Sequence, residues 1–135
     1  MFVFNHLVTL AFVAVVSAGL TRRQLPPDCS RSYTVVAGDY CHKISQEQGV
    51  STYQLMQVND GIINSECTNL WVDQEICLGI TGSDCTDVHT VVSGDTCSDL
   101  ADLHEITVED IIENNGKDEQ CDLLVGEVLC VGIPA

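Results

Sequence analysis

The sequence has few basic residues. Five Lys and Arg residues stand against 20 Asp and Glu residues, and only three of the five follow Arg23. All of the acidic residues lie at or after Asp28. A surface of this sign repels nucleic acid and anionic lipid, so the composition argues against nucleic-acid and membrane partners. It argues equally against polyanionic cell-wall polymers, whereas a neutral partner meets no such repulsion.

Motifs of metal sites and of catalysis are also missing. There is no C-x-x-C pair, and the four histidines form no ligand-like pair, so a zinc site is not favoured. No nucleophile motif surrounds any serine. Acidic pairs such as Glu109-Asp110 are typical of solvated helix faces rather than of two carboxylates held across a cleft. The sequence therefore predicts no catalytic residue, no metal and no cofactor, and hence no enzyme.

The long apolar run is confined to the N-terminus. It covers Leu7 to Val16 with one interruption at Thr9, and a small-residue cleavage site ends at Ala18. This pattern predicts a signal peptide over 1–18 and a secreted, extracellular protein, since the run is too short to span a bilayer comfortably. A short segment, 19–28, follows. Its Arg22-Arg23 pair has two open interpretations, a processing site or a basic stub.

Eight cysteines follow the predicted signal peptide, a high number for so short a chain. An even count in a secreted protein indicates a disulfide framework, which small domains need because they bury little apolar surface. The eight are Cys29, Cys41, Cys67, Cys77, Cys85, Cys97, Cys121 and Cys130.

The chain repeats itself at an offset of 56 residues. The stretch from Cys29 to Cys41 falls on that from Cys85 to Cys97, with Thr-Val-Val-x-Gly-Asp-x-Cys in common. The copies also end alike, which predicts one domain over 29–80, a linker over 81–84 and a second domain over 85–135. Four cysteines in matching positions imply bridges within each copy, and three pairings per copy stay open.

Each copy has the pattern strand, helix, helix, strand. In copy one, 33–36 and 75–78 are β-prone, Asp39 is suited to cap the first helix, and Ser51 with Gln54 predicts a capping box at the second. Copy two repeats the capping box with Thr107 and Asp110, and its closing strand is expected over 127–131. The predicted fold class is therefore α+β, with two tandem βααβ modules, each with a two-stranded antiparallel sheet and both helices on one face.

These residues resemble a known family. The series Tyr33-Thr-Val-x-x-Gly-Asp-x-Cys41, a capped helix, Asn59, and then Leu70-x-x-x-Gln74-x-Ile76-Cys77 is similar to a LysM domain. Two four-cysteine copies with little else resemble a fungal LysM effector. The resemblance covers Cys29 to Ile133, although Asn-Pro, frequent in the family, is replaced by Asn59-Asp60 and Asn115-Gly116.

The resemblance implies that the protein binds chitin or other N-acetylglucosamine oligomers, which either hides fragments from host receptors or shields the fungal wall. Family members hold the sugar between the loop after the first strand and the loop after the second helix. Carried over, the candidate residues are Gly38, Asp39, Tyr40, Asp60, Gly61, Ile62, Ile63 and Asn64 in copy one, and Gly94, Asp95, Thr96, Asn115 and Gly116 in copy two.

The two copies are not expected to bind equally. Copy two has Lys117-Asp118 where copy one has apolar residues, and it carries most of the negative charge, so copy one is predicted to be the principal site. Three binding modes stay open: one glycan held by both copies, a ligand-bridged homodimer, or independent sites. The alternative function is a disulfide-rich inhibitor or toxin-like protein without glycan binding.

Overall fold

The computed structural model describes residues 24–135, so the predicted signal peptide and the Arg22-Arg23 pair lie outside the described residues. Each copy folds as strand, helix, helix, strand, as predicted. Module one contains β1 (Cys29–Thr34), α1 (Cys41–Gln48), α2 (Thr52–Val58) and β2 (Glu75–Ile80). Module two contains β3 (Val88–Thr90), α3 (Cys97–His104), α4 (Val108–Asn114) and β4 (Val128–Cys130).

The strands of each module pair antiparallel, which confirms the predicted topology. β1 pairs with β2 and β3 pairs with β4, while no strand is shared between the modules. The bounds differ from the prediction, because β1 begins at Cys29 and ends at Thr34 instead of covering 33–36. The extra length lets Cys29 lie opposite Ile80 at the far end of β2.

The disulfides close within each module, as predicted, and the pairing is the same in both. Cys29–Cys77 joins β1 to β2, and Cys85–Cys130 joins the segment just before β3 to β4. Cys41–Cys67 and Cys97–Cys121 join the start of the first helix to the loop after the second. Each module has one small apolar core, centred on fully buried side chains such as Ile44 and Leu55 in module one, and Ile111 and Leu129 in module two.

The helix caps differ from the prediction at two positions. Asp39 does not cap α1; the N-cap is Tyr40, whose side chain makes no cap hydrogen bond. Ser51 caps α2 as predicted, but the Gln54 side chain does not complete a capping box. The box predicted from Thr107 and Asp110 does form at α4. Asp39 instead accepts hydrogen bonds within the turn that precedes α1, whereas Gln54 binds residues distant in sequence, as described below.

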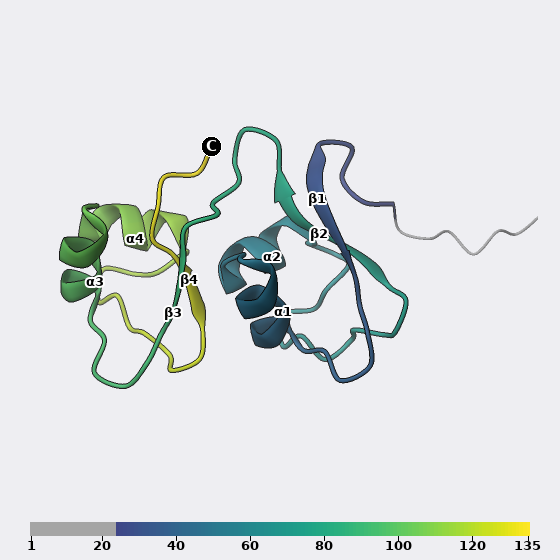
Figure 1. The fold of residues 1–135 in the computed structure, drawn as a ribbon, viewed down its shortest axis with the longest axis horizontal. Helices are drawn as coiled ribbons and strands as arrows, with labels where there is room; N and C mark the ends of the chain where they lie inside the picture. Colours follow the sequence, from purple (N-terminus) through teal and green to yellow (C-terminus); the bar gives the residue numbers. More distant parts are fainter. Residues whose placement is uncertain (1–23) are drawn as a thin grey trace, which may run out of the picture.

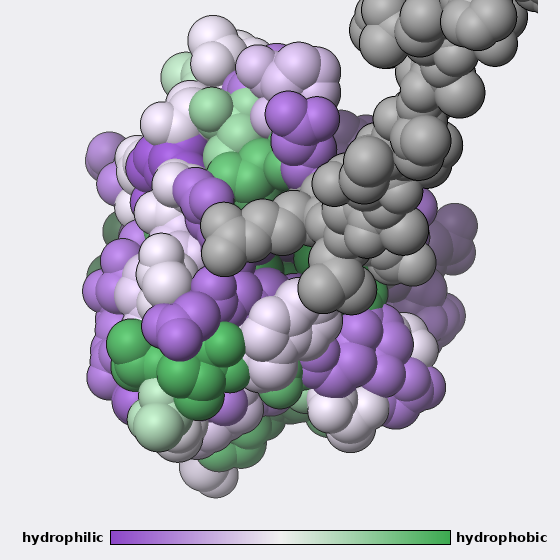
Figure 2. Space-filling model, turned by 90° about the vertical axis from the view of Figure 1, so that its right-hand side faces the viewer, coloured by the Kyte–Doolittle hydropathy of each residue, from purple (hydrophilic) through white to green (hydrophobic). Residues whose placement is uncertain are grey.

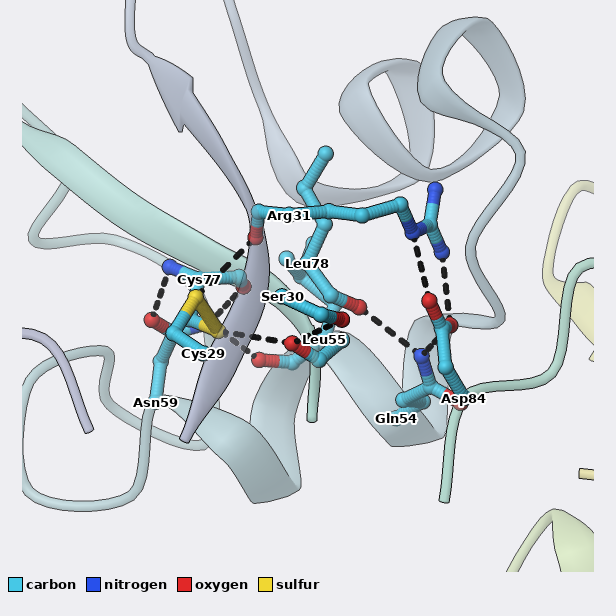
Figure 3. The surroundings of a disulfide bond; sticks show 10 residues. Cys29, Ser30, Arg31, Gln54, Leu55, Asn59, Cys77, Leu78 and Asp84 are labelled. Atoms are coloured by element: carbon cyan, nitrogen blue, oxygen red, sulfur yellow. Dashed lines mark hydrogen bonds and ion pairs between the residues drawn. A yellow bond between two sulfur atoms is a disulfide. The ribbon is translucent and has the colours of Figure 1, made fainter. Parts of the chain in front are cut away.

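A buried asparagine connects helix and sheet in each module. The Asn59 amide donates to the carbonyls of Leu55 (2.7 Å) and Cys77 (2.6 Å), and its oxygen accepts from the Cys77 N–H (2.8 Å). Asn59 is fully buried, and Figure 3 shows it beside the Cys29–Cys77 bridge. Asn115 repeats the arrangement with Ile111 and Cys130. One side chain thus ties the second helix to the disulfide-bonded strand.

The two modules pack against each other in alternating layers. Figure 1 shows the helices of module one between their own sheet and the sheet of module two, with α3 and α4 on the outer side. The edge of β4 faces α1 and α2, and the Val128 N–H donates to the Thr52 hydroxyl (3.0 Å). The linker therefore joins two modules that share a contact surface.

Asp84, at the end of the linker, holds this arrangement together. Its carboxylate accepts from the Arg31 guanidinium at 2.7 and 2.8 Å and from the Gln54 amide at 2.7 Å (Figure 3). The Gln54 oxygen in turn accepts from the Cys85 N–H (3.0 Å). Gly79 leaves the space for the carboxylate, since a Cβ there would overlap it. Segments from β1, α2 and the start of module two meet at this one group.

The Asn59→Asp variant tests the asparagine contact. The carboxylate cannot donate to both carbonyls, so we expect the free energy of unfolding to fall by roughly 2–4 kcal/mol. Urea unfolding followed by circular dichroism measures the loss. Gln57→Glu, the same chemical change at an exposed position of α2, should shift stability by no more than about 0.5 kcal/mol. Equal losses in the two variants would contradict the prediction.

The Asp84→Asn variant tests the contact at the linker. The hydrogen bonds from Arg31 lower the pKa of Asp84 below its ordinary value of 3.8, against the effect of burial, and Gln54 adds to them. The carboxylate therefore stabilises the fold at neutral pH, and this contribution is lost as the pH falls through the lowered pKa. We expect the free energy of unfolding of wild type to exceed that of the variant by about 1–2 kcal/mol at pH 7. This difference in stability should vanish in acid.

Thermal unfolding at pH 7 and at decreasing pH measures this difference. Asp102→Asn, at an exposed position of α3, is the control for the loss of one negative charge. If the difference in stability between wild type and Asp84→Asn grew as the pH fell, the ionised Asp84 carboxylate would not be the stabilising group.

Candidate functional site

The loop after β1 is built around the Asp39 carboxylate. It accepts from the Val36 N–H (2.9 Å), the Tyr33 hydroxyl (2.8 Å) and the Lys43 ammonium group (3.0 Å). Gly38 lies between, with φ +87°, a conformation that other residues rarely adopt. The turn that presents Tyr40 is thus fixed by its own hydrogen bonds.

The charge of Asp39 is set by these same contacts. Burial acts to raise the pKa of the carboxyl, but hydrogen bonds from Val36, Tyr33 and Lys43 outweigh it and leave the pKa below its ordinary value. The pKa of Tyr33 is raised because its hydroxyl donates to Asp39. Asp39 is therefore ionised at neutral pH and is satisfied within the turn, so it supports the loop.

Module two repeats this turn with two changes, since His89 replaces Tyr33 and Asp99 stands where module one has Lys43. Asp95 accepts from the Val92 N–H (2.9 Å), and His89, in place of the tyrosine, lies 2.7 Å away through Nε2. The N–H of Val92 and then His89 lower the pKa of Asp95. Thr96 caps α3 through its hydroxyl, which accepts from the Asp99 N–H. The predicted residues Asp95 and Thr96 thus hold the loop and the helix start, while Gly94 stays exposed.

The loop after α2 turns sharply at Asn59. The N–H groups of Ile62 and Ile63 both donate to the Asn59 carbonyl, at 2.8 and 2.9 Å. Ile63 is then buried in the core and Ile62 is half-buried against it, while Asp60 and Gly61 are exposed. Asn64 exchanges hydrogen bonds with Thr68. Of the predicted apolar pair, only Ile62 has side-chain surface open to a ligand.

A hollow of about 250 Å³ lies between the two loops of module one, at the Cys41–Cys67 bridge. Tyr40, which is 59% exposed, forms part of its wall. The loop after α2 contributes later residues than the sequence predicted. The lining residues are Tyr40, Cys41, His42, Thr52, Met56, Ser65, Glu66 and Cys67. The match between Cys67 and Cys121 in the repeat was the one sequence signal pointing to this part of the loop.

The first part of that loop borders a different hollow. Asp60, Gly61 and Ile62 line it together with Val58, and the segment 24–27 forms its other wall. Of the predicted site residues of module one, Tyr40 therefore lines one depression and Asp60, Gly61 and Ile62 line the other. The remaining four, Gly38, Asp39, Ile63 and Asn64, line neither. In Figure 2, which views the molecule from the side of β1 and β2, hydrophobic areas are small and separated by hydrophilic ones.

The loop after α4 is arranged differently in module two. Asn115 is buried, and its amide is used in the contact with Ile111 and Cys130, so its side chain is not open to a ligand. Gly116 is exposed, with φ +57°, and Lys117 beside it binds both oxygens of Glu127 at 2.6 and 2.8 Å. Of the two predicted residues in this loop, only Gly116 is open to a ligand, and it offers backbone groups alone.

Neither a metal site nor a membrane-spanning helix is found in residues 24–135. This part of the chain holds no group of three or more His, Cys, Asp and Glu side chains that could bind a metal ion. Nor does it contain a helix of the length and apolarity needed to cross a membrane.

Comparisons with known proteins agree on one family. The family model of the LysM domain matches residues 33–79 and 89–132. A secreted LysM effector, LysM1, of Trichophyton rubrum is 28% identical, with 84% of this chain and 54% of the relative covered. Secreted LysM effector Blys2 of Beauveria bassiana is 32% identical, with 78% and 32% covered. This chain thus spans about half of one relative and a third of the other.

Among solved structures, the spore cortex-lytic enzyme SleL of Bacillus megaterium matches 77% of this chain and 22% of its own, at 20% identity and a TM-score of 0.41. The matches of the family model fall one on each module and together cover most of the described residues. The chain therefore belongs to the LysM domain family, and its two LysM domains are related to those of secreted fungal LysM effectors.

Proposed function

We propose that this protein is a secreted, non-catalytic carbohydrate-binding protein whose ligand is chitin or a shorter N-acetylglucosamine oligomer. The observation that carries the proposal is the hollow between the two loops of module one, with the exposed Tyr40 on its wall. The Cys41–Cys67 bridge fixes both loops before any ligand arrives, which lowers the entropic cost of binding.

The chemistry of the hollow suits a neutral sugar. Tyr40 and Met56 offer apolar surface for the methyl group and the apolar face of the sugar, and Ser65 and backbone groups offer hydrogen bonds to the acetamide. The lining holds one carboxyl group, that of Glu66. Glycoside hydrolysis generally uses two carboxyl groups across the scissile bond, so binding without cleavage fits the hollow better.

The biological role follows from the ligand and the family. The names of the relatives describe secreted effectors, and the closed disulfides fit an oxidising, extracellular setting. A protein of this kind either sequesters chitin fragments from host immune receptors or coats the fungal wall. We assign the principal site to module one, because its hollow carries the exposed Tyr40 and because this module as a whole carries less negative charge than module two. The alternative is a disulfide-rich inhibitor that binds no glycan.

Titration calorimetry with chitin oligomers of increasing length tests the proposal. We expect Tyr40→Ala to weaken binding about tenfold, since it removes one exposed aromatic contact. Trp71→Ala is the matched control: Trp71 is 58% exposed and lies outside the hollow, so its loss should leave the affinity unchanged. Absence of heat and of retention on insoluble chitin for wild type would favour the alternative. Equal effects of the two substitutions would place the site elsewhere.

The same titrations report the binding mode. Two oligomers per chain indicate independent sites, and half an oligomer per chain indicates a ligand-bridged homodimer. One oligomer per chain indicates either a glycan held by both modules or binding at module one alone.

A further inference from the structure

Module two contains no Phe, Tyr or Trp. The last aromatic residue of the chain is Trp71, and every later position holds another residue type. Aromatic rings are a favourable surface for the apolar face of a pyranose, and module one has Tyr40 at this place. The corresponding residue of module two is Thr96, which is used as a helix cap. On its own, module two lacks such a surface.

The packing of the modules brings an aromatic ring to this loop. Tyr53 lies in the first turn of α2, next to Thr52, whose hydroxyl accepts from the Val128 N–H of β4. The Tyr53 ring contacts the backbone of Gly116 so closely that a Cβ at position 116 would overlap it. A candidate loop of module two thus touches a ring from module one.

The ring is not sealed within the interface. Tyr53 is 38% exposed, and Gly116 is exposed as well, so a ligand at this loop can reach both. The Cys97–Cys121 bridge holds the loop after β3 against the loop that begins at Gly116. The Lys117 ammonium group, paired with Glu127, keeps the start of that loop in place.

We propose that Tyr53 is a binding residue of the module-two site, where it supplies the apolar platform for one N-acetylglucosamine ring beside the Gly116 backbone. This inference rests on the proposed function. Its consequence is that the second site is composite: module two provides the polar loops and module one provides the aromatic surface. The packing of the modules is then part of the binding site.

Heteronuclear NMR titration of the secreted chain with chitotetraose tests the inference, because the amides of Gly94 and Gly116 report on module two while those of Gly38 and Gly61 report on module one. In Tyr53→Ala we expect the dissociation constant from the module-two amides to rise roughly fivefold to tenfold, with that from module one unchanged. Tyr53→Phe, which keeps the ring, should restore the affinity.

Tyr53→Leu separates binding from packing. Leucine keeps apolar bulk against Gly116 but has no ring face, so it should weaken the module-two site nearly as much as alanine does. Full affinity in Tyr53→Leu, or an unchanged constant in Tyr53→Ala, would overturn the inference while the module-one amides still respond to the sugar. No response at either site in wild type would instead refute the proposed function. Trp71→Ala is again the control and should leave both constants unchanged.

Discussion

The fold of each module depends on a buried asparagine amide placed between a helix and a disulfide-bonded strand. A two-stranded sheet is marginal by itself in water, and the cores are small. Asn59 and Asn115 use all of their hydrogen-bonding groups to fix the end of the second helix on the last strand, next to Cys77 and Cys130. The loop that leaves this helix therefore starts from a fixed point, which positions the candidate site loops.

Equivalent positions of the two modules serve different contacts. Asp110 completes a capping box on its own helix, whereas Gln54, at the same place in the repeat, reaches across to Asp84 and Cys85. The difference follows from what each module faces: module one has a partner packed against its helices, whereas α3 and α4 lie on the outer side of the molecule (Figure 1). The two copies thus share one scaffold, and the helices of the first copy contact the second.

Local and repeated features of the sequence predicted much of the fold. Hydrophobic patterning, Ser51 and Thr107 as caps, and the matched cysteines specify the elements and the bridging within copies, because these depend on near neighbours or on the repeat. The roles of Asp39, Gln54 and Tyr53 could not be predicted. Asp39 binds residues within six positions of itself, but its carboxylate suits a helix cap as well as this turn, and only the backbone geometry decides between them. Gln54 and Tyr53 contact residues far away in the sequence, which only the packing of the two modules brings near. Likewise, sequence placed Ile63 in a site loop, but its burial is set by how the loop closes.

The charge of the described surface bears on the ligand. All three basic side chains in residues 24–135 are engaged in ion pairs: Arg31 with Asp84, Lys43 with Asp39, and Lys117 with Glu127. No lysine or arginine of this region is left over to meet an anionic polymer, while most carboxylates are exposed. The proposed binding of a glycan would then rest on apolar contact and on hydrogen bonds, and a neutral N-acetylated sugar can make both without electrostatic repulsion.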